Sequence, residues 1–278
     1  MYEDVNRVPV MHGDEQKSYY KYFNRELPEI PQWKQDILKD PVKDPSIALS
    51  IHDKNKLFDP GELPTEIGIY FPEEGGAIIH NQQFFPNATG AMGEWWFAWF
   101  PGDDMRFQIW DPLEHRHSKL PELGAMERLR DPNVPVAEKS RGLLVRALES
   151  AERGSETYNI SDLYFENPAD VGYDAEKIHT DACSFLLCCN VFIYTPAGTL
   201  PAFGTHFWRD VEGGCQMRTF FWVGYQIING EAKCLAPKGV TPPLPALVRT
   251  LRHNYDEYEF LAQILPDLYA EEKDNWAN

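Results

Sequence analysis

The sequence predicts an α+β fold in which a curved antiparallel sheet grips one long C-terminal helix. Two observations support this prediction. Several strand-like segments occupy the middle of the chain, and a long helical pattern from about residue 244 to 269 follows them. The chain has 278 residues, of which 43% are hydrophobic. That is enough to bury a sizeable core in one large domain.

The first 60 residues differ in composition from the rest of the chain. They are polar and are interrupted by prolines at positions 28, 31, 41, 45 and 60. We predict that residues 1–60 form an N-terminal extension of short helices and loops that wraps the body or a partner subunit. Residues 61–278 are then the main domain. Such an extension is compatible with a homodimer.

The segments that follow residue 60 are expected to form the first part of the sheet. EIGIYF (66–71) and GAIIHNQQFF (76–85) have the composition of strands or short buried segments. GEWWFAWF (93–100) fits a buried strand or a helical turn, because its aromatic density hides the period. MRFQIW (105–110) alternates, so we predict a strand that enters the turn WDPLEH.

The second half of the chain is expected to complete the sheet. If RGLLVRALES (141–150) is a strand, Val145, Ala147 and Glu149 share one of its faces. Further strands are predicted within residues 159–172, 182–194, 204–214 and 215–228. A Glu-Gly-Gly turn joins the last two.

Charge and composition restrict the classes of partner and the compartment. The chain carries 43 acidic and 26 basic residues, a net charge of −17, and therefore repels nucleic acid and anionic membranes. It contains no apolar run long enough for a transmembrane helix, and its first residues show no secretory signal. The five cysteines form no CxxC pair, which favours buried reduced thiols. We expect a cytoplasmic protein.

His253 and Glu257 stand one turn apart on the predicted C-terminal helix. They lie outside the arc predicted to face solvent, which consists of Arg249, Arg252, Asp256, Glu259, Gln263 and Asp267. A carboxylate directed at the protein interior is costly unless it is paired or binds a cation. The pair therefore fits either a buried His–Glu hydrogen bond or half of a metal site.

Four segments in this order and spacing resemble the 2,4-diacetylphloroglucinol hydrolase family, which includes phloretin hydrolases. They are GEWWFAWF, RFQIWDPLEH, GTHFWRDVEGGCQMRTFFWVG and HNYDEYEFLAQILPDLYAEE, and the resemblance extends from about residue 65 to the C-terminus. It implies a helix-grip fold of the START/birch-allergen type. It also implies a zinc-dependent hydrolase that cleaves a carbon–carbon bond of an acylated phenol or polyketide-like ketone in a retro-Claisen reaction. Residues 61–278 are then the catalytic domain.

The resemblance also implies roles for individual residues. The family's zinc ligands correspond to His115, Glu149, His253 and Glu257. Other divalent metals suit the same ligand types. Two alternatives for Glu149, namely Glu152 and Glu156, lie close by in the sequence, and His117 is a competing histidine ligand. His206 corresponds to a family histidine near the substrate, which implies a catalytic role as an acid or base or in holding a ring hydroxyl.

The predicted substrate-binding residues depart from the family pattern. They are Phe107, Ser118, Phe221, Trp96 and Phe100. The bacterial phloroglucinol hydrolases resemble this chain but have tyrosine at Phe107 and Phe221 and asparagine at Ser118. Many relatives also have histidine at Phe100. Since these changes remove groups that hydrogen-bond a polyphenol, we expect a more apolar pocket and a different aromatic or polyketide substrate.

Two alternative functions keep the same fold. One retains the metal site and uses it for cyclisation, isomerisation or lyase chemistry on a secondary metabolite. The other is a carrier that binds a hydrophobic ligand without chemistry. A carrier should contain no stoichiometric zinc, whereas only hydrolysis releases a carboxylic acid from the substrate.

Overall fold

The structure, a computed structural model, describes residues 6–195 and 198–276. Its main sheet has eight antiparallel strands in the order β1-β2-β8-β7-β6-β5-β4-β3. Their bounds are β1 Gly68–Tyr70, β2 Ala77–Pro86, β3 His115–Lys119, β4 Leu143–Ser150, β5 Tyr158–Phe165, β6 Phe185–Thr195, β7 Gly198–Val211 and β8 Gly214–Val223. A separate hairpin pairs β9 (Tyr225–Ile228) with β10 (Glu231–Cys234).

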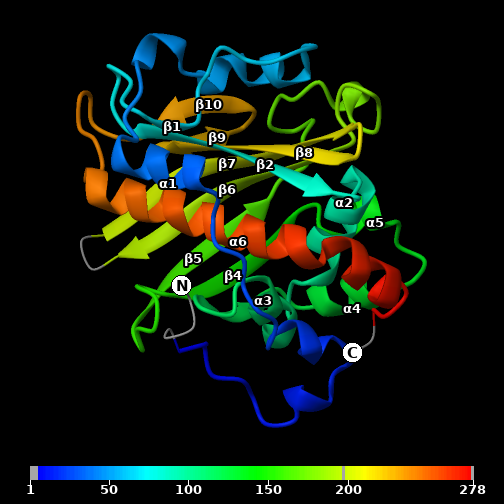
Figure 1. The fold of residues 1–278 in the computed structure, drawn as a ribbon. Coiled ribbons are helices and arrows are strands. Elements are labelled where there is room, and N and C mark those ends of the chain that lie inside the picture. The colour runs from blue at the N-terminus through cyan, green and yellow to red at the C-terminus, as the bar shows by residue number, and fades with distance from the viewer. Residues whose placement is uncertain (1–5, 196–197, 277–278) are drawn as a thin grey trace.

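Helix α6 (Leu244–Glu272) lies across one face of this sheet (Figure 1). Its apolar side, which includes Leu251, Leu261 and Leu265, is fully buried. The prediction of an α+β, helix-grip fold with a long C-terminal helix is therefore confirmed. No helix among the described residues is long and apolar enough to span a bilayer.

The aromatic segments between β2 and β3 are helical. Residues 93–100, for which strand and helix stayed open, fall mostly in α2 (Gly90–Trp99). The predicted strand over residues 105–110 is wrong, because these residues form α3 (Asp104–Trp110). The Asp103 carboxylate caps α3 by accepting a hydrogen bond from the Arg106 N–H at 2.9 Å. Every residue from 105 to 110 is buried, so the apparent alternation did not reflect an exposed face.

Two shorter helices, α4 (Ala125–Arg130) and α5 (Val136–Lys139), lie between β3 and β4. The strand predicted over residues 215–228 is interrupted at Gly224. This glycine has φ +90°, a conformation that side-chain-bearing residues rarely adopt, so β8 and β9 are separate. The predicted exposure of Asp256 is also wrong, because its carboxylate is buried and pairs with Arg252 at 2.8 Å.

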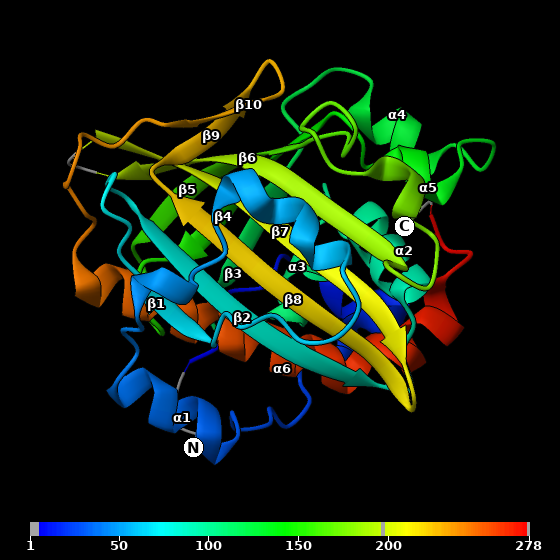
Figure 2. The ribbon, with the colours of Figure 1, turned by 90° about the horizontal axis from the view of Figure 1, so that it is seen from above.

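The N-terminal segment packs on both sides of the body. Helix α1 (Gln32–Lys39) lies against α6, and 3₁₀ turns occupy Asp14–Gln16, Ser18–Tyr22, Pro45–Ile47 and Ile51–Phe58, with a later one at Ala175–Lys177. Residues 45–60 cross the sheet face opposite α6 (Figure 2). There Leu57 and Phe58 join the same buried cluster as Phe220 and Trp222 of β8. Packing is thus continuous across residue 60, and the division into an extension and a main domain stays a prediction.

Candidate metal centre and active pocket

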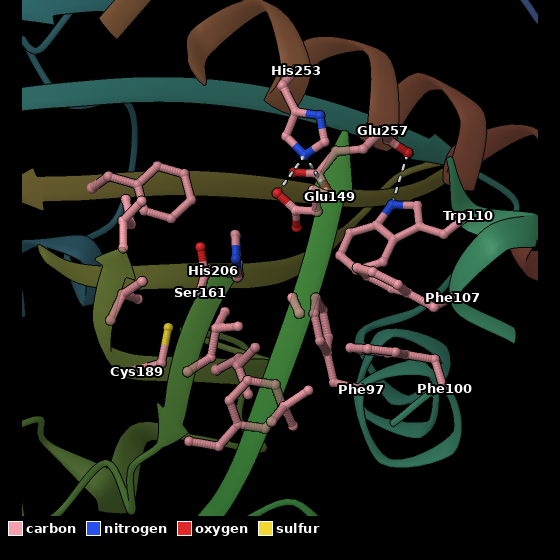
Figure 3. Close-up of a pocket in the computed structure, with 18 of the residues that line it drawn as sticks. Phe97, Phe100, Phe107, Trp110, Glu149, Ser161, Cys189, His206, His253 and Glu257 are labelled. Atoms are coloured by element: carbon pink, nitrogen blue, oxygen red, sulfur yellow. Dashed lines mark hydrogen bonds and ion pairs between the residues drawn. The ribbon is translucent and has the colours of Figure 1, made fainter. Parts of the chain in front are cut away.

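Two strands and one helix bring the four predicted metal ligands together. His115 begins β3 and faces Glu149 of β4 directly in the antiparallel register. His253 and Glu257 lie one turn apart on α6, above the same end of these strands (Figure 3). Opposed residues of an antiparallel pair share one side of the sheet, so the imidazole and the carboxylate meet.

The imidazole and carboxylate groups face one another at near-ligand separations. The Nε2 atom of His115 is 3.7 Å from Glu257 Oε2 and 4.0 Å from Glu149 Oε1. The Nε2 atom of His253 is 3.8 Å from Glu149 Oε2 and 4.0 Å from Glu257 Oε2. Ligand atoms bound tetrahedrally to zinc lie about 3.4 Å apart, so a small inward shift of these side chains would complete such a site.

The second ring nitrogen of each histidine is held from behind. The Nδ1–H of His115 donates to the Phe107 carbonyl oxygen at 3.1 Å, and His253 Nδ1 lies 2.9 Å from Glu114 Oε2. Contacts of this kind orient metal-binding histidines in proteins. The Nε2 atom of His115 is buried and has no hydrogen-bond partner among the described residues. A buried, unpartnered nitrogen between carboxylates is suited to a cation.

The Glu257 carboxylate is also held within the protein, whereas the Glu149 side chain is 30% exposed. Glu257 Oε1 accepts a hydrogen bond from Asn254 Nδ2 at 2.8 Å. Asn254 Oδ1 in turn accepts one from Asn81 Nδ2 of β2 at 2.7 Å. Burial, followed by the neighbouring charge of Glu149, raises the pKa of Glu257 to about 8, and burial also raises the pKa of Glu149. A divalent cation would allow both groups to remain ionised.

The two imidazoles differ in their electrostatic surroundings. Burial, and then the charge of His253, lower the pKa of His115 well below its ordinary value, so its Nε2 keeps its lone pair. Burial by itself would lower the pKa of His253. The negative charges of Glu114, Glu257 and Glu149 outweigh burial and raise this pKa well above the ordinary value. With two imidazoles and two carboxylates, the donor set fits a divalent transition metal.

Asp111 is a further acidic neighbour of the histidines. Each of Asp111, His115 and His253 has one potential ligand atom, and these three atoms lie within 4.8 Å of one another. However, Asp111 Oδ1 accepts a hydrogen bond from the Leu113 N–H at 2.9 Å, and Oδ2 lies 3.7 Å from Nδ1 of His253. His253 Nδ1 is the ring nitrogen that faces the Glu114 carboxylate, and not the Nε2 atom that faces Glu149 and Glu257. We therefore assign Asp111 a position behind the four ligands.

The competing ligands lie elsewhere. Glu152 and Glu156 are exposed in the connection between β4 and β5. His117 has a side chain that is 36% exposed, and its Nδ1 lies 2.8 Å from Asp104 Oδ2. For none of the three is an ion pair with His115 or His253 found among the described residues.

An aromatic pocket of about 140 Å³ adjoins the ligand cluster. Its aromatic and polar lining includes Phe97, Phe100, Phe107, Trp110, Glu149, Ser161, His206, His253 and Glu257 (Figure 3), together with Phe221 and Tyr258. Val145 and Ala147 line it beside Glu149, which is the strand face that alternation predicted. The predicted residues Phe100, Phe107 and Phe221 therefore share one cavity with the ligand cluster.

Two predicted substrate-binding residues lie outside this lining, and their predicted place is corrected accordingly. Trp96 packs behind the wall, stacked on Phe100 at 5.6 Å and edge-on to Trp110. Ser118 is fully buried, and its Oγ accepts a hydrogen bond from the Gly102 N–H at 3.2 Å. Both side chains support the loop and helix that form the wall.

His206 of β7 contributes a polar group to the opposite side of the pocket. Its Nδ1 is 2.8 Å from Thr219 Oγ1, and its Nε2 is 3.1 Å from the Tyr258 hydroxyl. Phe97 stacks on the ring with centroids 5.6 Å apart. Burial lowers the pKa of His206 to about 3, so the imidazole is neutral at neutral pH. The interpretation of the sequence missed Tyr258, although it directly follows Glu257.

Comparison with known proteins identifies the family. Residues 48–270 match the family described as "DAPG hydrolase PhiG domain". The chain belongs to this family. It is 34% identical to phloretin hydrolase of Eubacterium ramulus, over 99% of this chain and 100% of that protein. It is 25% identical to 2,4-diacetylphloroglucinol hydrolase of a Pseudomonas species, over 92% of this chain and 88% of that protein.

The family resemblance inferred from the four segments is thus confirmed, and so is the prediction of a hydrolase. A third relative, 2,4-diacetylphloroglucinol hydrolase of Pseudomonas protegens, is 24% identical over 92% of this chain and 84% of its own. The crystal structure of Ara h 8.0201 aligns with a TM-score of 0.38 and 9% identity, over 68% of this chain and 97% of that one.

Proposed function

We propose that this DAPG hydrolase family member is a zinc-dependent enzyme that cleaves the carbon–carbon bond between an aromatic ring and an acyl group. The single observation that carries the proposal is the convergence of His115, Glu149, His253 and Glu257 at one end of an aromatic pocket. The names of the relatives, phloretin hydrolase and 2,4-diacetylphloroglucinol hydrolase, favour an acylated phenol as the small-molecule substrate.

Zinc is the metal we propose, because imidazole and carboxylate donors suit it. When bound, it would supply a Lewis acid that polarises a ketone oxygen or lowers the pKa of a water. Four side chains of this chain would hold it, and Glu114 and Asn254 would keep His253 and Glu257 in position.

The proposed reaction is a hydrolysis of the retro-Claisen type. The ring carbon that carries the acyl group takes up a proton, and water adds to the acyl carbonyl carbon. The ring–acyl bond then breaks with its electron pair moving to the ring, which gives a phenol and a carboxylic acid. His206 and Tyr258 are the paired polar groups that can hold a ring hydroxyl or pass this proton. The aromatic walls keep other water away.

The wall near the ring offers few hydrogen-bonding groups. Phe107 stacks on His115 with ring centroids 3.9 Å apart, and Phe221 lies edge-on to His206 at 5.7 Å. Neither can hydrogen-bond a ring hydroxyl. We therefore propose a substrate ring with fewer hydroxyls than a polyphenol, because an unpaired hydroxyl in an apolar wall is costly.

Product analysis tests this proposal. Purified protein incubated with an acylated phenol should release equal amounts of a carboxylic acid and the free phenol. Chelation should abolish this release, zinc should restore it, and Glu257→Gln should prevent both activity and zinc binding. A product of unchanged mass would instead indicate cyclisation or isomerisation. An unchanged ligand would indicate a carrier, and full activity without any metal would contradict the metal site.

A further inference from the structure

A second apolar cavity adjoins the active pocket. It has a volume of about 480 Å³, against about 140 Å³ for the inner pocket. The two cavities share Val191, Ile193, Phe221 and Thr250 as lining residues. Beyond this boundary, the lining of the second cavity includes Leu200, Ala202, Val223, Ala246 and Leu247. We call this second cavity the outer groove.

The outer groove runs along α6, away from the candidate metal ligands. Three lining residues on α6 mark its course: His253 in the inner pocket, Thr250 at the boundary and Ala246 in the outer groove. His253 and Ala246 are seven positions apart on the helix, a distance of about 10 Å along the axis. Ala246 is exposed, so the groove reaches solvent near the start of α6.

The chemistry of the two linings differs sharply. The inner pocket includes Glu149, His206, His253 and Tyr258, all of which can meet polar atoms of a substrate. Among the residues that the structure describes, the outer groove is lined by no charged residue, and its polar side chains are threonines. A hydroxylated ring placed there would lose hydrogen bonds to water without replacement, whereas an apolar chain would gain by burial.

We infer that the outer groove binds the apolar tail of the acyl group, an alkyl or aryl-alkyl chain, while the phenol ring occupies the inner pocket. This inference rests on the proposed function, because that reaction places the acyl carbonyl between the ring and the tail. Phe221 and Thr250 form the boundary where the tail passes from one cavity to the other. Ala246 and Leu247 contact its far end, so they set the preference for chain length.

Filling the groove tests this assignment. Ala246→Phe adds a ring inside it, and Ala270→Phe is a matched control at an exposed position near the other end of α6. We expect Ala246→Phe to lower kcat/KM about tenfold for a 3-phenylpropanoyl phenol and to leave the acetyl analogue within about twofold. The control should leave both substrates unchanged. If the ratio of kcat/KM for the 3-phenylpropanoyl phenol to kcat/KM for the acetyl analogue were the same in Ala246→Phe and wild type, the inference would be overturned.

A binding measurement separates this inference from the proposed reaction. Calorimetry with 3-phenylpropan-1-ol, which has the tail but no phenol ring, should detect binding to wild type and Ala270→Phe and none to Ala246→Phe. This binding pattern would support the assignment of the outer groove even if no acylated phenol were cleaved. A lack of cleavage would count against the proposed reaction alone. Unchanged binding in Ala246→Phe would overturn the groove, whatever the activity.

Discussion

At the scale of single residues, Tyr258 is the pocket-lining side chain whose hydroxyl contacts the candidate acid–base group, His206. Its hydroxyl lies 3.1 Å from His206 Nε2. We expect Tyr258→Phe to lower kcat about tenfold, because the imidazole keeps its contact with Thr219 but loses the hydroxyl on the pocket side, with metal content unchanged. Tyr255→Phe is the control, since Tyr255 is buried on the same helix and its hydroxyl has no partner among the described residues. Wild-type kcat in Tyr258→Phe would contradict this role.

The sequence could not distinguish Tyr258 from a core residue. Helical spacing places it among the leucines of the apolar side of α6, and an aromatic ring there is most simply explained by packing. Spacing also placed Asp256 in the exposed arc, although Arg252 and Arg153 both pair with it. Helical periodicity predicts the direction of a side chain, but it does not predict which residue from another part of the chain will contact that side chain.

His80 provides a pH-dependent test of stability at the residue scale. It is 2% exposed, its Nδ1–H donates to the Glu66 carbonyl oxygen at 2.9 Å, and burial lowers its pKa to about 4. The unfolded chain therefore binds this proton more readily than the folded protein. Its contribution to stability is complete above about pH 6.5 and is lost as the pH falls towards 4, by about 3 kcal/mol.

Denaturant unfolding at several pH values measures this loss. The free energy of unfolding of His80→Gln should fall less steeply between pH 6.5 and 4.5 than that of wild type. His52→Gln, at an exposed position, should retain the wild-type slope. Identical slopes for wild type and both variants would show that the buried imidazole does not determine the acid response.

At the scale of secondary-structure elements, a buried amide pair connects β2 to α6 behind the candidate ligands. Asn81 donates to Asn254, and Asn254 donates to Glu257. We expect Asn254→Ala to weaken zinc binding by about ten- to a hundredfold, because the Glu257 carboxylate loses its orienting donor. Competition with a chelator of known affinity measures this. Asn190→Ala, which removes hydrogen bonds to Glu166 and Ile227, is a matched control that should leave zinc affinity unchanged.

Helices and strands were predicted correctly where the two faces of the segment lie in different surroundings, such as solvent on one side and the core on the other. The strands and α6 show such patterns, and β4 turns Val145, Ala147 and Glu149 into the pocket as alternation indicated. Helix α3 is buried on all sides, so its sequence lacks the 3.6-residue period of an amphipathic helix, and the alternation that it shows instead predicts a strand. Its local signal was the capping carboxylate of Asp103, which the alternation of the next residues concealed.

At the scale of the whole molecule, the first 60 residues contribute to the fold as well as to its surface. Leu57 is fully buried against the face of the sheet opposite α6. We expect Leu57→Ala to lower the free energy of unfolding by about 2–5 kcal/mol, because the cavity it leaves lies under a fixed sheet. Leu123→Ala, at a fully exposed position, should change it little. A loss of less than about 0.5 kcal/mol in Leu57→Ala would show that this segment is only loosely attached.

The candidate site as a whole depends on contacts between distant segments. The sequence alone left Glu149, Glu152 and Glu156 as alternatives, because they lie within a few residues of one another. Strand register separates them, since only Glu149 stands opposite His115. Without the family resemblance, nothing local would have linked His115 to a helix more than 130 residues later in the chain.

The most direct test of the central claim is a crystal structure with anomalous diffraction recorded on both sides of the zinc absorption edge. We expect one anomalous peak bounded by His115 Nε2, His253 Nε2 and the carboxylates of Glu149 and Glu257. The absence of a peak there in zinc-loaded protein, or a peak held instead by Asp111 with Glu149 and Glu257 turned away, would contradict it.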